Sequence, residues 1–493
     1  MSALPTETRA SEATDHGRRW WILAVLCTAQ LMVVLDATIV NIALPTAQDD
    51  LGFSDDLRQW VVTAYALAFG SLLFVGGRLG DMIGRKPLLL AGLSGFAVAS
   101  AVGGAAGSIE LLIVARACQG VFGAMLAPAT LSLLTTTFTS PHERGRAFAI
   151  YGAIAGGGGA IGLLLGGALT EYLSWRWCLL VNLPIAVLAF VGAVALLPRT
   201  VRDRTATLDV PGAVLSVAGL VAIVYGLANA ETDGWTSAGT LGFIGAGLVV
   251  LAAFAWVQTR VAHPLLPLSV LLDRTRGGSY LAVGIAGAGM FGVFLFLTYY
   301  MSSVLGFDPL PTGVAFLPMI GGLMVAAQLA TPVLERIGVK VPVTAGFVVA
   351  AGGMALLTRL DLDSSYATGV LPGLVVVGLG LGLIMAPAMN AATDRVDPHH
   401  AGVASAAVNT FQQIGGSIGT AVFSALASSA ATDYLTGRDP SDPHVLAQAG
   451  MESYTTVFLW SGVVFTAGAV VCGLLLRHGS LERDPDAGPV LAH

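Results

Sequence analysis

Asp36 and Arg116 are the two ionisable residues that lie well inside long apolar runs of this sequence. A charge in the hydrocarbon interior of a membrane costs about 2.5–3.5 kcal/mol on insertion scales, so residues of this kind usually mark functional sites. At about 1.5 Å per helical residue, Asp36 would lie roughly 13 Å and Arg116 roughly 9 Å below the outer ends of their helices. We therefore expect the two side chains to meet in the outer half of a membrane.

Proton coupling is the chemistry that such a pair offers. Arginine keeps its proton in proteins, so Asp36 is the carboxylate within these runs that can load and release one. Contact with a guanidinium favours the charged carboxylate, whereas separation into an apolar surround favours the neutral acid. A cycle that makes and breaks the contact would release and bind a proton. The alternative that stays open is a purely structural ion pair.

Neutral polar and aromatic residues at similar depth form a second group that could line a substrate cavity. They are Asn41, Tyr65, Gln119, Phe291, Phe294, Asn409, Phe411, Gln412 and Gln413. Amides in a bilayer need partners, so they either bond between helices or offer hydrogen bonds in a cavity beside aromatic faces. With one carboxylate for the whole cavity, we expect neutral, zwitterionic or singly cationic amphiphiles as substrates rather than dications.

The apolar runs that carry these residues identify the class of protein. Hydrophobic residues make up 55% of the 493 residues and charged residues 11%, whereas soluble proteins have about 25% charged residues. A net charge of −6 without a concentrated basic region excludes nucleic acid as a partner. Fourteen runs reach the length of about 20 residues that crosses a bilayer, which predicts an all-α integral membrane protein with fourteen transmembrane helices. They lie at roughly 20–45, 58–79, 88–107, 110–136, 146–170, 176–197, 208–228, 237–257, 277–303, 311–333, 340–360, 366–390, 402–428 and 453–476.

A weak internal repeat divides these helices into two groups of six. The segment 77–86 reads GRLGDMIGRK and the segment 333–340 reads VLERIGVK, so that Gly84 aligns with Gly338. Spans 9–14 then repeat spans 1–6, and spans 7 and 8 are an inserted hairpin. Most lysines and arginines fall on one side, which predicts that both termini are cytoplasmic. The expected parts are a cytoplasmic N-terminal tail (1–19), an N-terminal six-helix bundle (20–197), the inserted pair with its linkers (198–276), a C-terminal six-helix bundle (277–476) and a cytoplasmic C-terminal tail (477–493).

Glycine is abundant in the fifth span, where Gly158, Gly162, Gly166 and Gly167 leave one helix face without side chains. Two helices could rock against each other at such a stripe, or simply pack closely. The segment 287–292 matches GxGxxG but has no preceding strand, so we expect no dinucleotide site. The four cysteines and the histidines at 399 and 400 lack metal-ligand spacing, and we expect neither a metal nor another cofactor.

Several segments together resemble the major facilitator superfamily, and within it the fourteen-span drug:proton antiporters of the EmrB/QacA type. The resemblance covers nearly the whole chain, and its motifs are specific as a set although each is modest alone. Beside the segment 77–86, they are LDATIVNIALP (35–45), QWVVTAY (59–65), RACQG (116–120), WRWCLLVNLP (175–184) and NTFQQIGG (409–416).

The resemblance implies a multi-pass transporter of the cell (inner, cytoplasmic) membrane that exports a hydrophobic drug or antibiotic by alternating access, driven by the proton gradient. It implies proton coupling at Asp36 and Arg116, and an antiporter motif on the glycine-rich fifth span. That motif normally has proline where this sequence has Leu163, so the helix should bend less. The residues implied for a cytoplasmic gate are Gly77, Asp81, Gly84, Arg85 and Lys86.

Other functions stay open at this point. The chain could export one endogenous metabolite or siderophore, or take up a substrate with protons. A channel is disfavoured because no charged or carbonyl-lined filter pattern is present. An enzyme is disfavoured because the spans contain no histidine or paired carboxylates. The expected partners are a small amphiphilic substrate, protons and the lipid bilayer, and the expected state is a monomer.

Overall fold

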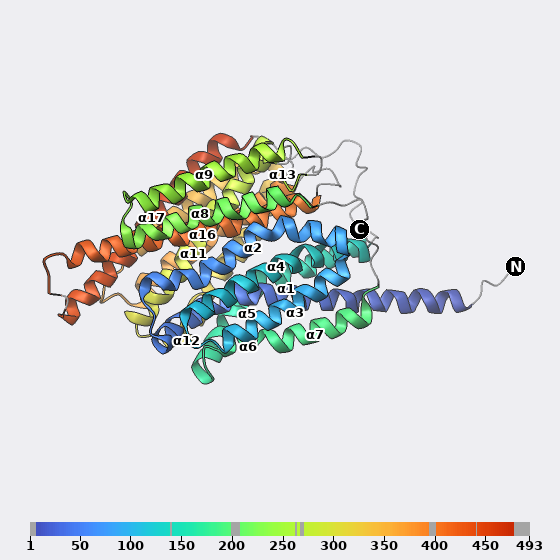
Figure 1. The fold of residues 1–493 in the computed structure, drawn as a ribbon, viewed down its shortest axis with the longest axis horizontal. Coiled ribbons are helices and arrows are strands. Elements are labelled where there is room, and N and C mark those ends of the chain that lie inside the picture. Colours follow the sequence, from blue (N-terminus) through green and yellow to red (C-terminus); the bar gives the residue numbers. More distant parts are fainter. Residues whose placement is uncertain are drawn as a thin grey trace.

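Long helices lying side by side make up the computed structural model, which describes residues 6–138, 141–198, 208–261, 264–266, 271–393, 401–439 and 441–477. Within these ranges thirteen helices are long and apolar enough to cross a membrane, and no strand occurs. A helical bundle suits a bilayer because each helix satisfies its own backbone hydrogen bonds. Figure 1 shows the bundle, with the first helix extending beyond it at the N-terminal end.

The N-terminal group follows the order of the first six predicted spans. Its helices are α1 (Thr6–Leu51), α2 (Asp55–Ile83), α3 (Arg85–Gly104), α4 (Ile109–Thr137), α5 (Pro141–Tyr172), α6 (Trp177–Leu180) and α7 (Asn182–Leu196). The helix α5 takes the place of the fifth predicted span, although it is not among the thirteen. The sixth predicted span is one apolar segment, Trp177–Leu196, in which α6 and α7 meet at Val181 with helical backbone angles. The helix α1 begins at Thr6, so a helix rather than an irregular tail precedes the apolar run.

The C-terminal group follows the last six predicted spans. Its elements are α11 (Arg274–Ser303), α12 (Pro309–Ala315), α13 (Leu317–Ile337), α14 (Lys340–Leu357), the short π-helix η1 (Tyr366–Val370), α15 (Leu371–Thr393), α16 (Ala401–Leu435) and α17 (Pro443–Leu475). The helix α11 is central, since 72% of its most apolar window is buried inside the protein.

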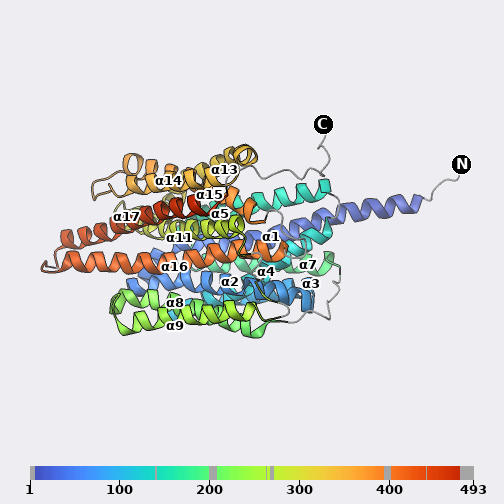
Figure 2. The same cartoon turned by 90° about the horizontal axis from the view of Figure 1, so that it is seen from above.

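Two further helices, α8 (Val210–Asp233) and α9 (Ala238–Gln258), lie at the edge of the bundle, at the positions predicted for the inserted pair (Figure 2). Only 11% of the apolar window of α9 is buried, as expected of a helix that faces lipid. The helix α8 instead packs against both groups, because Val224 shares one apolar cluster with Leu67 of α2 and Ala421 of α16. The linkers predicted on either side lie partly outside the described residues.

The two glycines that the predicted repeat aligns lie at helix junctions. Gly84 joins α2 to α3 with φ 98°, and Gly338 joins α13 to α14 with φ 81°. Both are left-handed conformations that favour glycine. The two aligned glycines thus have the same role at a helix junction, and the repeat itself stays a prediction. The segment 77–86 is less of a loop than its glycines suggest, because Gly77 lies within α2 and Arg85 already begins α3.

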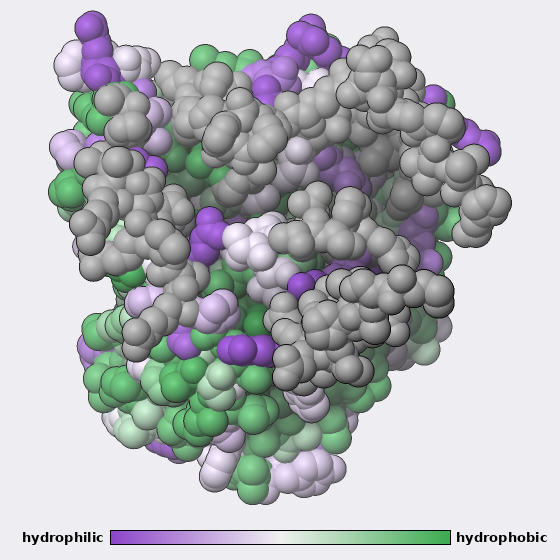
Figure 3. Space-filling view, turned by 90° about the vertical axis from the view of Figure 1, so that its right-hand side faces the viewer, coloured by the Kyte–Doolittle hydropathy of each residue, from purple (hydrophilic) through white to green (hydrophobic). Residues whose placement is uncertain are grey.

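Figure 3 views the end of the molecule at which the N-terminus emerges in Figure 1. Hydrophilic side chains gather on this end between larger apolar areas. The junction at Gly84 and the start of α11 at Arg274 belong to the same end, because successive helices alternate in direction. Basic side chains at this end bind backbone carbonyls at the C-terminal ends of neighbouring helices. Arg274 donates to the carbonyls of Leu474 and Leu475, and Arg18 donates to that of Leu196.

Candidate functional site: a buried carboxylate network

Asp36 of α1 lies at the centre of a hydrogen-bond network that is closed off from solvent. Its Oδ2 accepts a bond from Arg116 Nη1 at 2.6 Å, which is also an ion pair. Its Oδ1 accepts from Gln119 Nε2 at 2.8 Å and from Asn182 Nδ2 at 2.8 Å. Asp36 is fully buried and Arg116 is 1% exposed. The predicted meeting of the two charges is confirmed, and neutral amides surround the pair.

Arg116 is held from every side by α2 and α4. Its Nε donates to the carbonyl of Val61 at 3.1 Å, and its Nη1 also donates to Gln119 Oε1 at 2.9 Å. The guanidinium carbon lies 4.4 Å from the ring centroid of Tyr65, close enough for a cation–π interaction. Tyr65 in turn stacks on Phe69. These contacts hold the cation in one place beside the carboxylate.

Two members of the network, Ser100 and Asn182, were not predicted as site residues. Ser100 of α3 accepts a hydrogen bond from Gln119 Nε2 at 2.8 Å. Asn182 is the first residue of α7, and its side-chain amide lies against Asp36. Single neutral polar residues in apolar runs carry no signal that points to such a site.

Asn182 also has a spare hydrogen-bond acceptor. Its Oδ1 is buried and finds no hydrogen-bond partner among the described residues. A charged carboxylate accepts hydrogen bonds only, whereas a protonated one must donate a bond as well. Rotation of the Asn182 amide would turn this oxygen toward Asp36, where it could accept a hydrogen bond from the protonated carboxyl group. The network therefore has groups that suit both protonation states of the carboxyl group.

The remaining residues predicted for a cavity are spread over both groups of helices. Asn41 and Asn409 each donate to a carbonyl of their own helix, at Ala37 and Ser405. Gln412 and Gln413 of α16 lie where this helix packs closely against two others. The backbone carbonyl of Gln412 faces Gly287 of α11, and the side chain of Gln413 faces Gly70 of α2. The structure thus places Tyr65 and Gln119 in the Asp36 network and the α16 amides at helix contacts.

The three predicted phenylalanines pack within the C-terminal group. Phe411 stacks on Tyr280 with a centroid distance of 5.5 Å, and Phe294 lies 5.0 Å from Phe316. The ring of Phe291 lies against Gly416. These contacts are ordinary aromatic packing, and they leave a role in substrate binding as a prediction.

The glycine stripe of α5 packs against α1, the helix that carries Asp36. A Cβ atom at Gly158 would meet Val34, one at Gly162 would overlap Thr38, and one at Gly166 would lie 2.9 Å from the Ile39 carbonyl. Gly167 faces Leu310 of α12 instead. The glycines thus allow α5 to pack closely against α1 in this structure. The helix α5 continues without interruption through Leu163.

The residues predicted for a cytoplasmic gate hold the N-terminal group together here. Lys86 Nζ donates to the carbonyls of Val194 and Leu197 at the end of α7, at 2.9 and 2.5 Å. Arg85 donates to the Ser132 carbonyl of α4 at 3.4 Å. Gly77 makes only ordinary contact with Pro128. The side chain of Asp81 lies outside the described residues.

Polar contacts join the two groups of helices at the end opposite the N-terminus. Tyr299 of α11 donates to Gln48 Oε1 of α1 at 2.6 Å. The guanidinium of Arg58, a buried residue of α2, lies 4.4 Å from the ring centroid of Tyr299 and 5.6 Å from that of Phe296. The backbone N–H of Leu310 donates to Glu171 at 3.1 Å. The two groups are therefore clamped together at this end.

Comparisons with known proteins agree on the family. The family model described as Major Facilitator Superfamily matches residues 26–420. The chain is 49% identical over 480 residues to the puromycin resistance protein pur8 of Streptomyces alboniger, covering 97% of this chain and 95% of that protein. It is 40% identical over 404 residues to the cephamycin export protein CmcT of Amycolatopsis lactamdurans, covering 81% and 83%.

A solved structure supports the same conclusion at the level of the fold. It is the crystal structure of a bacterial homologue of the human lysosomal transporter Spinster in an inward-facing, unoccupied conformation, which matches with a TM-score of 0.63 at 15% identity. The match covers 93% of this chain and 97% of that one. Because the family model spans most of the sequence and the fold agrees over nearly all of it, this chain belongs to the Major Facilitator Superfamily.

Proposed function

We propose that this chain is a fourteen-span, proton-coupled exporter of a hydrophobic antibiotic or similar amphiphile in the cell membrane. The observation that carries the proposal is the buried Asp36–Arg116 pair, whose carboxylate accepts hydrogen bonds from three donors. Relatives named for puromycin resistance, cephamycin export and lincomycin resistance support the direction and the substrate class. No cofactor is needed, because the proton gradient supplies the driving force.

Alternating access gives the two ends of the bundle different roles. The end that carries the N-terminus is cytoplasmic in our proposal, because basic residues such as Arg18, Arg85 and Arg274 cluster there. The clamp formed by Tyr299, Gln48 and Arg58 closes the outer end. The described conformation is then one that is closed at the outer end.

Protonation of Asp36 is the step that we propose to couple to transport. A neutral Asp36 loses most of its attraction for Arg116, and its hydroxyl donates to the freed Oδ1 of Asn182. Arg116 then keeps its contacts with Gln119, Val61 and the ring of Tyr65. Because α1 packs on the glycine face of α5, a shift of α1 also moves α5. The helix α5 contacts α12 of the C-terminal group, so the movement reaches that group.

A transport assay with purified protein tests this function directly. Protein in liposomes with an imposed pH gradient and a pH dye is challenged with puromycin, cephamycin and lincomycin, and wild type is compared with Asp36→Asn. We expect drug-dependent proton release in the wild type and none in the variant. Asp308→Asn is the matched control, because Asp308 is an exposed carboxylate without a side-chain cap bond.

The outcomes separate the parts of the proposal. Proton release that persists in Asp36→Asn would remove Asp36 from the coupling role while leaving export intact. The absence of a response to all three compounds would contradict drug export and favour a dedicated exporter of another metabolite.

A further inference from the structure

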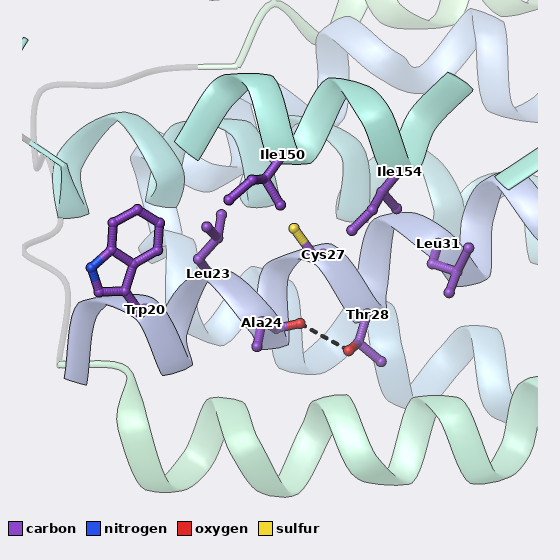
Figure 4. A pocket seen from close by; sticks show the side chains of 8 residues that line it. All are labelled: Trp20, Leu23, Ala24, Cys27, Thr28, Leu31, Ile150 and Ile154. Atoms are coloured by element: carbon purple, nitrogen blue, oxygen red, sulfur yellow. Dashed lines mark hydrogen bonds between the residues drawn. The ribbon is translucent and has the colours of Figure 1, made fainter. Parts of the chain in front are cut away.

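An apolar groove runs between α1 and α5 on the half of these helices nearer the N-terminus. It has a volume of about 420 Å³, and its lining includes Trp20, Leu23, Cys27 and Leu31 of α1 with Ile150 and Ile154 of α5 (Figure 4). Thr28 also lines the groove, but its hydroxyl donates to the Ala24 carbonyl at 2.8 Å. The walls therefore offer hydrophobic contact and little hydrogen bonding.

The length of the groove matches one leaflet of a bilayer. Trp20 and Leu31 mark its two ends (Figure 4). Eleven helical steps of 1.5 Å separate these residues, which gives roughly 16 Å, about half of a hydrocarbon core of about 30 Å. A hydrocarbon chain that enters beside Trp20 would thus reach the middle of the membrane at Leu31.

Positive charge gathers at the mouth of the groove. The exposed guanidinium of Arg146 lies 5.1 Å from the ring centroid of Trp20. Arg19 pairs with Glu143 at 3.5 Å. Among the described side chains at this mouth, two arginines thus stand beside one acid, and Arg146 is the arginine nearest Trp20. Tryptophan rings and basic groups of this kind lie at the headgroup level of membranes.

From this geometry we infer that the α1–α5 groove binds an anionic phospholipid of the adjacent leaflet. Its acyl chain lies in the groove, and its phosphate group binds Arg146 beside Trp20. Basic pockets between transmembrane helices on the cytoplasmic side are known to suit anionic headgroups. The bound acyl chain fills the space between α1 and α5 next to their contact at Gly158. It therefore stabilises the position of α1, the helix that carries Asp36. The inference does not depend on the transported substrate.

Native mass spectrometry of the full-length, delipidated protein tests the site. The protein is titrated with phosphatidylglycerol and, separately, with phosphatidylcholine of the same acyl chains. We expect wild type to retain phosphatidylglycerol in preference. In Arg146→Gln we expect retention about fivefold weaker, the loss expected for one basic contact with an anionic headgroup. Ala24→Phe, which narrows the groove from an exposed position of α1, should weaken retention of both lipids.

A matched control separates the site from a general effect of surface charge. Arg260→Gln removes an exposed arginine that lies 5.6 Å from the ring of Trp256 on α9, away from the groove. We expect it to retain phosphatidylglycerol as the wild type does. Equal retention by Arg146→Gln and wild type, or equal retention of the two lipids by wild type, would overturn the inference. The exposed position of Arg146 keeps this test available even if Ala24→Phe fails to fold.

Discussion

At the scale of single residues, the Asp36–Arg116 pair is stabilised by neutral groups rather than by further charges. A buried ion pair offsets its desolvation only when additional hydrogen bonds satisfy the remaining lone pairs. Here Gln119 and Asn182 serve the second carboxylate oxygen, and Val61 serves the guanidinium. Each partner is therefore expected to influence both the position of the carboxyl group and the stability of the fold.

Removal of the Asn182 amide should slow transport without unfolding the protein. Asn182→Leu keeps the side-chain size but removes one donor to Asp36 and the spare acceptor. We expect drug-dependent proton release to fall about tenfold, since a hydrogen bond to a charged group is worth about 1.5 kcal/mol. Asn390→Ala is the control, because the exposed Asn390 bonds only to its own helix in the described contacts. An Asn182→Leu rate equal to the wild type would contradict the role of this amide.

The two charges should depend on each other for stability. Arg116→Gln leaves Asp36 buried without its cation, which costs about 3–5 kcal/mol for pairs of this kind. Asp36→Asn/Arg116→Gln removes both charges and should recover most of that loss, although it should not couple protons. Thermal unfolding in detergent measures both effects. Equal Tm values for the single Arg116→Gln variant and the double variant would show that the pair is not coupled in this way.

The same residues show how far sequence alone could lead. The Asp36–Arg116 contact could be predicted because charges stand out in apolar runs and because helix geometry fixes their depth. Ser100 and Asn182 could not, since one hydroxyl or amide in an apolar helix is common. Arg58 is the first residue of the second predicted span, and no sequence pattern indicated its burial against Tyr299. That contact depends on how the two halves meet, which a single sequence does not reveal.

At the scale of helices, the order of the elements was predictable and their packing partners were not. Apolar runs predict where helices cross a membrane, so α8 and α9 were expected as an inserted pair. The contact of Asn182, at the start of α7, with Asp36 depends on how α7 packs on α1, and no change in hydropathy marks it. The function of the α5 stripe also depends on what faces it, and here that is α1.

The contact between α5 and α1 leads to a prediction about single methyl groups. Gly166→Ala places a Cβ atom 2.9 Å from the Ile39 carbonyl, so α1 and α5 must move apart. We expect a loss of roughly 1–3 kcal/mol in stability, as for other overpacked contacts, and a lower Tm. Gly157→Ala on the same helix is the control, because nothing lies within 4 Å of its Cβ position. Similar Tm values for the two variants would mean that the helices separate without cost.

At the scale of the whole molecule, the N-terminal group, the C-terminal group and the α8–α9 pair are held together by polar contacts and by apolar contacts. The polar clamp at the end opposite the N-terminus joins the two halves through Tyr299, Gln48 and Arg58. The inserted helix α8 joins them along their length through apolar contacts with α2 and α16. Apolar side chains can slide past one another, whereas a hydrogen bond has one geometry. We therefore expect the clamp, rather than the inserted pair, to set which conformation is favoured.

Tyr299→Phe tests that expectation, since it removes the hydroxyl that donates to Gln48 and keeps the ring beside Arg58. Loss of one hydrogen bond, about 1 kcal/mol, changes the ratio of two conformations about fivefold. Spin labels at Gly107→Cys and Ala367→Cys, both exposed at the outer end on opposite halves, report the opening as longer distances. The background carries Cys118→Ala, because Cys118 is exposed.

The control for this experiment is Tyr225→Phe, which removes a hydroxyl from α8 in the inserted pair. If the clamp governs the equilibrium, Tyr299→Phe lengthens the distances between the labels and Tyr225→Phe leaves them unchanged. An unchanged distribution in Tyr299→Phe would mean that the apolar contacts of α8 with α2 and α16 hold the outer end closed by themselves. The inserted pair would then be the element that decides the conformation.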